Sequence, residues 1–306
     1  MSEGRAADEA VDRSRQRTIS RSALGRHRRF AEVSPELGRL DEQAVDDAMR
    51  ADPDGTLGLL AELTGATDAR LRELARSLAG RLVLDVARRG PVHPRGTGTI
   101  ASRPYRPDAG DLDVDASTEA ITEAIASDAA VDPERLRVRQ WVRPATALCL
   151  LVDRSGSMGG VALATSAVAA AAVAFRAPHD YSVLGFSRDV VAVKSQGTDK
   201  PAERVVDGVL ALRGHGTTDL AGALWAAARQ LERSRAGRKI TVLLSDCRAT
   251  EPGDVHAAAA DLDELVIVAP AGDADAAAEL AASVGAPMAT VDGPASVVPA
   301  LLQVLS

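Results

Sequence analysis

The hydrophobic residues in the second half of the chain fall into short runs separated by longer amphipathic segments. Residues 147–152 form an uninterrupted apolar run, residues 265–269 form another, and residues 240–244 are apolar except for Thr241. Runs of this kind are typical of strands buried on both faces of a parallel sheet. Because helical segments lie between them, the order predicts an α/β fold: a doubly wound, mostly parallel sheet with helices on both faces.

The same reading places the remaining elements of this sheet domain. We expect further strands at residues 181–186, 190–194 and 288–291, and helices at residues 161–176, 201–212, 220–235, 274–284 and 295–305. The helix at 161–176 is almost entirely alanine and valine. A helix that is apolar all round is buried, so we expect it between the sheet and another layer.

The first half of the chain has a different pattern. Leucines return at three- and four-residue steps over residues 34–89, which predicts two or three amphipathic helices. They could form a small helical domain or cover one face of the sheet domain. Residues 90–113 are rich in proline and glycine and predict a linker or extended arm without regular structure. A helix at 116–130 and a strand at 136–142 follow, and we expect that strand at the edge of the next sheet.

These patterns predict three regions. Residues 1–33 are arginine-rich and polar, which indicates a disordered basic tail, or alternatively a basic arm that docks on an acidic partner. Residues 34–142 form a helical N-terminal region that contains the linker near 90–113. Residues 143–306 form the α/β domain.

Composition narrows the classes of function. Of the 306 residues 46% are hydrophobic, but only 2% are aromatic, and the net charge is −7. Few rings and a negative charge argue against nucleic acid as a partner. The sequence has no apolar signal-peptide core and no membrane-spanning segment, so we expect a cytoplasmic protein with no membrane partner. Cys149 and Cys247 fit small buried hydrophobes in a reducing compartment better than a redox-sensitive pair.

The candidate chemistry lies where the first apolar run ends. Asp153-Arg154-Ser155-Gly156-Ser157 places a carboxylate and two hydroxyls on one tight loop. Ligands of open α/β sheets bind at the carboxyl ends of the strands. Oxygen ligands suit Mg²⁺, Ca²⁺ or Mn²⁺ and disfavour metals that prefer cysteine or histidine.

The segment from Asp153 to Ser157 resembles the first part of the metal-ion-dependent adhesion site of von Willebrand factor A (VWA) domains. That family completes the site with a threonine and an aspartate, and Thr218 and Asp246 lie at corresponding places, before a helix and after a strand. Thr217 competes for the threonine role, and Thr218 fits the helix start better. We expect Asp219 to cap that helix.

The resemblance implies a function and its partners. In the family, Asp153, Ser155, Ser157, Thr218 and Asp246 would hold Mg²⁺, or Mn²⁺ or Ca²⁺, with one position open for a carboxylate of a partner protein. The arrangement is most similar to bacterial CoxE-like A-domain proteins, whose implied partners are MoxR-type AAA+ ATPases in complex remodelling or metal insertion. Candidate partner contacts around the metal are Arg154, Met158, Arg213, His215 and Arg248; the three arginines could equally be solvated loop charges.

The sequence lacks the motifs of the enzyme classes that share this type of fold. The loop from Ser155 to Gly160 does not match the dinucleotide fingerprint, and the chain has neither a P-loop nor a nucleophile elbow. Aspartate-based phosphatases need a second carboxylate two residues after the first, where this chain has Ser155. We therefore expect a binding protein without enzymatic activity. The alternatives are a metal-dependent phosphoester hydrolase that uses Asp153, and a structural domain with an inactive site.

Overall fold

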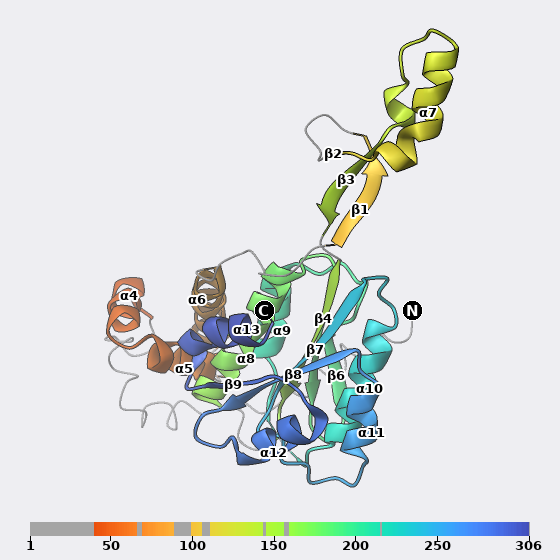
Figure 1. Cartoon of the computed structure of the whole chain (residues 1–306). Coiled ribbons are helices and arrows are strands. Elements are labelled where there is room, and N and C mark those ends of the chain that lie inside the picture. Colours follow the sequence, from red (N-terminus) through yellow and green to blue (C-terminus); the bar gives the residue numbers. More distant parts are fainter. Residues whose placement is uncertain are drawn as a thin grey trace. The chain divides into compact units, whose positions relative to one another are not determined.

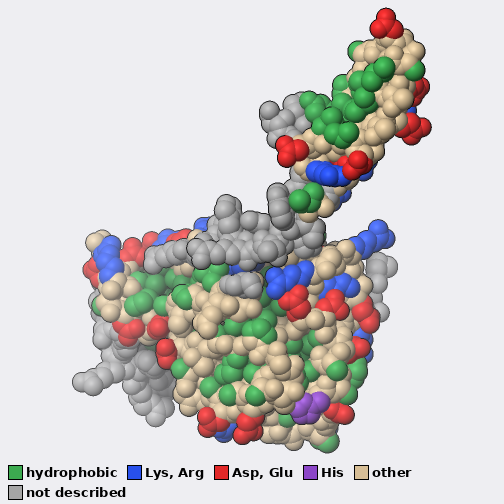
Figure 2. All heavy atoms as spheres, in the orientation of Figure 1, with side chains coloured by type: hydrophobic (Ala, Val, Ile, Leu, Met, Phe, Trp, Pro, Cys, Tyr) green, Lys and Arg blue, Asp and Glu red, His purple; other side chains and the backbone are tan. Residues whose placement is uncertain are grey.

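The structure, a computed structural model, describes residues 40–65, 69–88, 99–105, 111–142, 145–155, 159–214 and 216–305. The chain divides into two compact units, one of residues 1–94 with 146–306 and the other of residues 95–145. The predicted region 34–142 is therefore shared between two units. The predicted basic tail, residues 1–33, lies outside the described residues. Figure 1 labels the elements of both units, and Figure 2 shows their side chains coloured by type in the same orientation.

The larger unit is built on a six-stranded sheet with the strand order β6-β5-β4-β7-β8-β9. Neighbouring strands are parallel except β6, which pairs antiparallel with β5 at one edge. The strands are β4 (Thr146–Asp153), β5 (Tyr181–Phe186), β6 (Val190–Lys194), β7 (Arg238–Leu244), β8 (Glu264–Pro270) and β9 (Met288–Val291). β4 lies between β5 and β7 and is buried from Ala147 to Val152, as its apolar run predicts.

Hydrophobic side chains form one core on each face of this sheet. On β4, Leu148, Leu150 and Val152 belong to the first core. The alternating residues Ala147, Cys149 and Leu151 belong to the second. Because successive side chains of a strand point to opposite faces, both faces of β4 are covered. The prediction of a doubly wound sheet is confirmed.

Helices cover the two faces in unequal depth (Figure 1). The first core includes residues of α4 (Glu42–Ala51), α5 (Pro53–Leu63), α6 (Ala69–Arg88), α8 (Gly160–Arg176), α9 (Ala202–Leu210) and α13 (Val297–Val304). The second includes residues of α10 (Leu220–Leu231), α11 (Val255–Ala260) and α12 (Asp275–Val284). A short 3₁₀ turn, η2 (Pro294–Ser296), precedes α13. Among the described residues, no helix combines the length and apolar character that crossing a membrane requires.

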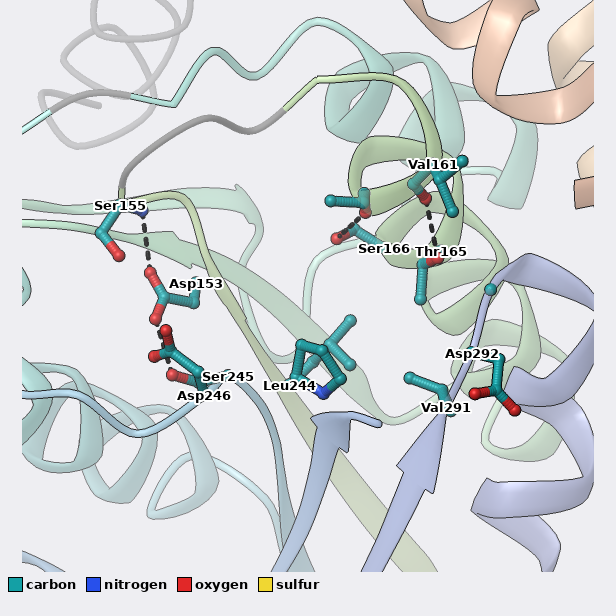
Figure 3. Close-up of a pocket in the computed structure, with 13 residues that line it drawn as sticks. Asp153, Ser155, Val161, Thr165, Ser166, Leu244, Ser245, Asp246, Val291 and Asp292 are labelled. Atoms are coloured by element: carbon teal, nitrogen blue, oxygen red, sulfur yellow. Dashed lines mark hydrogen bonds between the residues drawn. The ribbon is translucent and has the colours of Figure 1, made fainter. Parts of the chain in front are cut away.

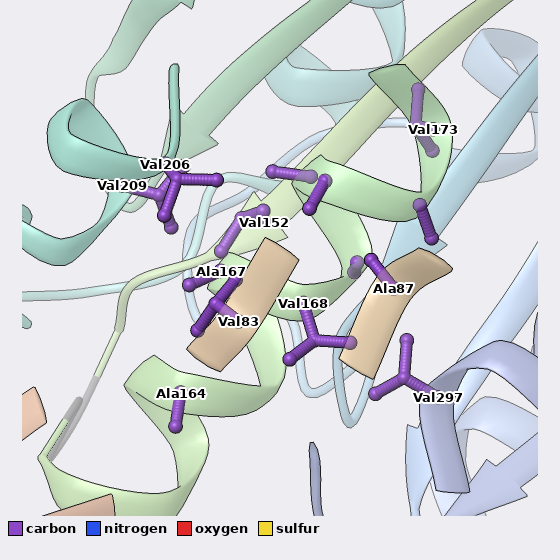
Figure 4. Packing of buried hydrophobic residues seen from close by; sticks show 14 of the residues in the cluster. Val83, Ala87, Val152, Ala164, Ala167, Val168, Val173, Val206, Val209 and Val297 are labelled. Atoms are coloured by element: carbon purple, nitrogen blue, oxygen red, sulfur yellow. The ribbon is translucent and has the colours of Figure 1, made fainter. Parts of the chain in front are cut away.

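Helix α8 is the centre of the first core (Figure 4). Every residue from Leu163 to Ala174 is buried. The sheet and α9 contact α8, and α5 and α6 of the N-terminal region pack on it as well. Val83 and Ala87 of α6 lie in this cluster. The expected burial of α8 is confirmed, and the N-terminal helices take the second of their two predicted arrangements, as a cover on the sheet domain.

The smaller unit has a three-stranded antiparallel sheet with the order β1-β3-β2. Its elements are β1 (Thr99–Pro104), β2 (Asp111–Leu112), α7 (Val114–Ala126), the 3₁₀ turn η1 (Pro133–Arg135) and β3 (Arg137–Val142). Asp113 caps α7 by accepting a hydrogen bond from the backbone N–H of Ala116. The predicted helix over 116–130 is therefore present, but it begins two residues earlier and ends at Ala126.

Two predictions for this part of the chain were wrong. Residues 90–113 contain β1 and β2, although we expected no regular element there. Prolines are tolerated at strand ends and on edge strands, and Pro104 is the last residue of an edge strand, so the breakers did not prevent pairing. The strand predicted over 136–142 exists as β3, but it pairs with β1 and β2 instead of joining the larger sheet.

Candidate functional site

The predicted metal ligands Asp153 and Asp246 come from the ends of two adjacent strands. Asp153 is the last residue of β4, and Ser245 and Asp246 directly follow β7. The two strands are parallel and in register, with Val152 opposite Leu244. Their carboxyl ends therefore meet at one edge of the sheet, where ligands of open α/β folds bind.

Both oxygens of the Asp153 carboxylate accept hydrogen bonds (Figure 3). Oδ1 accepts from the backbone N–H of Ser155 at 2.8 Å, and Oδ2 accepts from the hydroxyl of Ser245 at 2.6 Å. The Ser245 hydroxyl itself accepts from the backbone N–H of Cys247 at 2.9 Å, which directs its own proton toward Asp153. A carboxylate oxygen has two lone pairs, so each can still bind a cation. The two hydrogen bonds therefore fix the carboxylate and leave a lone pair on each oxygen for a cation.

Asp246 is held by its own turn. Its Oδ1 accepts from the backbone N–H of Arg248 at 3.0 Å, the same i to i+2 bond that Asp153 makes with Ser155. Cys247, between Asp246 and Arg248, has a φ of 61°, in the left-handed region that non-glycine residues rarely adopt. Burial, together with the charges of Asp246 and Asp153, raises the pKa of the Cys247 thiol to about 12. Cys247 is thus a neutral, buried residue of a tight turn.

The second cysteine is similarly inert. Burial raises the pKa of the Cys149 thiol to about 12, against the opposing effect of a hydrogen bond with Ser182. Both cysteines are free thiols. The prediction that they are small buried hydrophobes agrees with their positions in the second core and the turn after β7.

Thr218 is fixed between the loops that follow β5 and β7. The backbone N–H of its neighbour Asp219 donates to the carbonyl of Ser187, just after β5, at 2.9 Å. The Thr218 carbonyl accepts from the N–H groups of Thr250 and Glu251, after β7, at 3.0 and 3.1 Å. β5 and β7 are the two neighbours of β4, so this segment spans the end of the strand that carries Asp153.

The structure also bears on the choice between the two threonines. The exposed Thr217 donates its hydroxyl to Glu251, whereas Thr218 is 3% exposed. Asp219 caps α10 by accepting from the N–H of Gly222 at 2.8 Å, as predicted. Thr218 is not among the residues that line the pocket of Asp153, so its choice as the ligand stays a prediction.

Three of the five predicted ligands line one pocket. Asp153, Ser155 and Asp246 share a cavity of about 580 Å³ whose other walls come from α8 and from the ends of β7, β8 and β9. Among the residues that the structure describes, its charged lining residues are Asp153, Asp246 and Asp292, without any lysine, arginine or histidine. None of the ion pairs between described residues involves Asp153 or Asp246. Carboxylate oxygens without a cationic side chain beside them are suitable ligands for a hard divalent cation.

A cation here would depend on hydroxyl ligands as well as carboxylates. In the described part of the chain, no group of three or more His, Cys, Asp or Glu side chains is arranged to hold a metal ion. Ser155 lies next to Asp153 in the pocket and supplies such a hydroxyl. Ser157 lies outside the described residues, so its place in the set stays a prediction.

The predicted partner contacts differ in their exposure. Arg154 is 4% exposed, and burial lowers its pKa against the opposing charge of Asp189. It therefore has no surface from which to steer a partner. Alternation along the chain explains this: Arg154 follows Val152 on the first face, and its Cδ lies 3.5 Å from the Cβ position of Gly185.

Arg213 and Arg248 are engaged in other ways. Nη1 of Arg213 donates to the carbonyls of Leu210 and Leu212 at 2.9 and 2.8 Å, and burial, with the charges of Arg76 and Arg72, lowers its pKa. Arg248 is exposed and forms an ion pair with Asp273. Met158 and His215 lie outside the described residues. Of the predicted cationic contacts that the structure describes, Arg248 is the one on the surface.

Sequence reasoning missed two contributions to the site. One is Ser245, which fixes Asp153. The other is α5: a Cβ at Gly58 would lie 2.8 Å from Cγ2 of Val161, and Oε1 of Glu62 lies 2.6 Å from the Cβ position of Gly160, where α8 begins with a φ of 50°. An isolated glycine within an apolar helical pattern signals close packing, so Gly58 carried a readable clue. Helix α5 thus contacts the start of α8, the helix that follows Asp153 and Ser155 in the chain.

The fold is that of an α/β protein with a mostly parallel sheet between helices, and a comparison with known families identifies its class. The family model described as "VWA domain containing CoxE-like protein" matches residues 88–284. The chain belongs to this family. None of the curated proteins matches the sequence.

Several solved structures are similar to part of the chain. They include a von Willebrand factor type A protein from Catenulispora acidiphila, with a TM-score of 0.43, 15% identity and coverage of 55% of this chain and 43% of that one. Proximal thread matrix protein 1 from the mussel byssus has a TM-score of 0.40 and 14% identity, and the match covers 52% of this chain and 46% of that one. Manganese-loaded TRAP protein from Plasmodium vivax has a TM-score of 0.39 and 14% identity, and the match covers 50% of this chain and 70% of that one. The chain thus spans less than half the length of the first two of these structures.

Proposed function

We propose that this VWA protein is a non-enzymatic adaptor that holds a divalent cation and uses it to bind a carboxylate of a partner protein. The five ligands would be Asp153, Ser155, Ser157, Thr218 and Asp246, with Mg²⁺, Mn²⁺ or Ca²⁺ as the cation. The observation that carries the proposal is the Asp153 carboxylate, held at both oxygens by Ser155 and Ser245 in a pocket shared with Asp246.

The chemistry of the donors supports binding to an acidic group. The two aspartates supply negative charge that a divalent cation neutralises, while the hydroxyls are neutral ligands. The cation then offers a positive site in a pocket that otherwise repels anions. A carboxylate from another protein is the complementary ligand.

The family supports the choice of partner. The CoxE-like family implies MoxR-type AAA+ ATPases as partners. We therefore infer that the partner is an ATPase of this type and that the two proteins act in complex remodelling or metal insertion. The described surface offers Arg248 as a contact beside the site, since Arg154 is buried and Arg213 donates hydrogen bonds to carbonyls at the end of α9 and just after it.

Isothermal titration with Mn²⁺ and Mg²⁺ tests the metal site. We expect saturable binding to the wild-type chain, and none to Asp153→Asn or to the Ser155→Ala/Ser157→Ala double variant. Asp292→Asn is the matched control, because Asp292 is a carboxylate of the same pocket outside the ligand set. At a metal concentration of 100 times Kd, binding also stabilises the fold by about 2.7 kcal/mol. Absence of binding to the wild type would indicate a structural domain with an inactive site.

Two further measurements separate the adaptor from the enzyme. The wild-type chain used as bait should retain a MoxR-type AAA+ ATPase that a chelator releases and that the double variant does not retain. A phosphatase assay with p-nitrophenyl phosphate and Mg²⁺ should show no turnover. Metal-dependent turnover that Asp153→Ala abolishes would replace the adaptor by a phosphoester hydrolase.

A further inference from the structure

The pocket that contains the acidic edge continues into an apolar region. Beyond Asp153 and Asp246, its walls are Val161 at the start of α8, Leu244 at the end of β7 and Val291 at the end of β9. Figure 3 shows Leu244 between the acidic residues and Val291. Leu244 and Val291 are 7% and 5% exposed, but Val161 is 39% exposed at the first turn of its helix. An apolar surface is thus accessible directly beside the carboxylates.

The hydroxyls in this region have no proton left to donate to a ligand. Thr165 donates its hydroxyl to the carbonyl of Val161 at 2.7 Å, and Ser166 donates to that of Ala162 at 2.9 Å. Both bonds stay within α8, the usual arrangement for these residues inside a helix. The far part of the pocket therefore favours an aliphatic group over one that needs a donor.

Charge determines when an acidic ligand can enter. In the part of the chain that the structure describes, the three charged residues that line the pocket are all aspartates. Without a cation they repel an anion, since like charges in a partly enclosed site disfavour one another. A carboxylate can enter only when a divalent cation has neutralised Asp153 and Asp246.

We propose that the pocket binds a partner segment in which the metal-bound carboxylate is accompanied by an aliphatic side chain, and that this side chain lies between Val161, Leu244 and Val291. The inference rests on the proposed function and names the chemistry of its partner: an acidic residue next to an aliphatic one. A cavity of about 580 Å³ is within the range of ligand pockets and holds both groups.

Straight-chain carboxylates test this directly. Acetate, butyrate and hexanoate are titrated into the full chain loaded with Mg²⁺, and again in the presence of a chelator. Burial of each methylene should increase affinity about fourfold, so butyrate should bind about sixteenfold more tightly than acetate. With the chelator, none of the three should bind. Val161→Ser should reduce the dependence on chain length, whereas Val114→Ser, at an exposed valine of the smaller unit, should not.

The outcomes separate this inference from the proposed function. Metal-dependent binding with equal affinity for all three acids would overturn the aliphatic subsite and leave the adaptor intact. Absence of binding in the presence of Mg²⁺ would overturn both. Dependence on chain length that persists under chelation would show an apolar pocket uncoupled from the cation, and would also overturn the inference. The comparison within the wild-type chain is decisive even if Val161→Ser fails to fold.

Discussion

The hydroxyl of Ser245 donates a 2.6 Å hydrogen bond to Oδ2 of Asp153, and so connects the ends of the two central strands of the sheet. The bond has a defined direction, because the same hydroxyl accepts from the N–H of Cys247. Ser245 therefore orients the carboxylate without being one of the predicted ligands. Such outer partners of metal ligands usually matter nearly as much as the ligands themselves.

Ser245→Ala should weaken metal binding while leaving the ligand set intact. We expect a roughly tenfold to hundredfold loss of Mn²⁺ affinity, the usual effect of removing an outer partner, measured by isothermal titration. Ser283→Ala is the control, since the Ser283 hydroxyl donates to a carbonyl of its own helix α12. Wild-type affinity in Ser245→Ala would show that the hydrogen bond does not position Asp153.

The strands of the larger unit were predictable because a strand buried in a sheet appears in the sequence as a short apolar run. Residues 181–186, 190–194 and 288–291 are strands with the predicted bounds. Their apolar runs are short and end in turn residues, so competing helices are excluded by length. The smaller unit was not predictable in this way, because pairing of β1 with β3 depends on contacts distant in sequence, and edge strands tolerate the prolines that usually indicate loops.

The candidate site was predictable only in part. Asp153, Ser155 and Asp246 were found because they lie at or within two residues of the ends of buried strands, in segments that resemble the metal site of the family, and the structure places all three in one pocket. The burial of Arg154 depends on which face of the sheet the helices cover, which its local sequence does not encode. The contact of Glu62 with the start of α8 joins residues almost a hundred positions apart.

The packing of α5 on α8 makes opposite predictions for two helical glycines. Alanine is favoured over glycine in a helix by about 1 kcal/mol. At Gly80 of α6 an added Cβ meets its nearest atom at 3.8 Å, an ordinary contact, so Gly80→Ala should stabilise the fold. At Gly58 it would lie 2.8 Å from Cγ2 and 3.0 Å from the backbone N of Val161. Overpacking costs about 1–3 kcal/mol, so Gly58→Ala should destabilise it.

Urea denaturation of both variants tests this difference. Because Val161 lies in the first turn of α8, the helix that follows the predicted ligands Asp153 and Ser155, Gly58→Ala should also lower Mn²⁺ affinity, and Gly80→Ala should not. Equal stabilisation by the two substitutions would show that α5 does not press on the start of α8. Unchanged metal affinity in a destabilised Gly58→Ala would limit the contact to a structural role.

Tyr181 at the start of β5 predicts sensitivity to alkaline pH. The side chain is 2% exposed, and burial, with the nearby charges of Glu203 and Asp199, raises its pKa to about 12. The native state therefore retains the phenolic proton above pH 10, where the unfolded chain releases it. Stability from this residue is complete below about pH 10 and is lost as the pH rises toward 12.

Tyr181→Phe removes this titration. Between pH 9 and 11.5 we expect the free energy of unfolding of this variant to fall by about 2 kcal/mol less than that of the wild type. Urea denaturation at several pH values measures the slope. Tyr105→Phe is the control, because it removes the other tyrosine, which is 41% exposed. The same alkaline decline in Tyr181→Phe and the wild type would contradict the assignment.

The two units should differ in how far the metal site depends on them. Neither core cluster of the larger unit includes a described residue of the smaller one, residues 95–145. Replacing 95–145 with a Gly/Ser linker should therefore preserve the melting temperature within a few degrees and the affinity for Mn²⁺, even though the family match includes this segment. Deleting residues 1–94 removes α5 and α6, whose buried leucines cover α8, so it should give an insoluble or unfolded chain. Metal binding that persists without residues 1–94 would show that the predicted site does not need the N-terminal helices. Loss of metal binding without residues 95–145 would show that it needs the smaller unit.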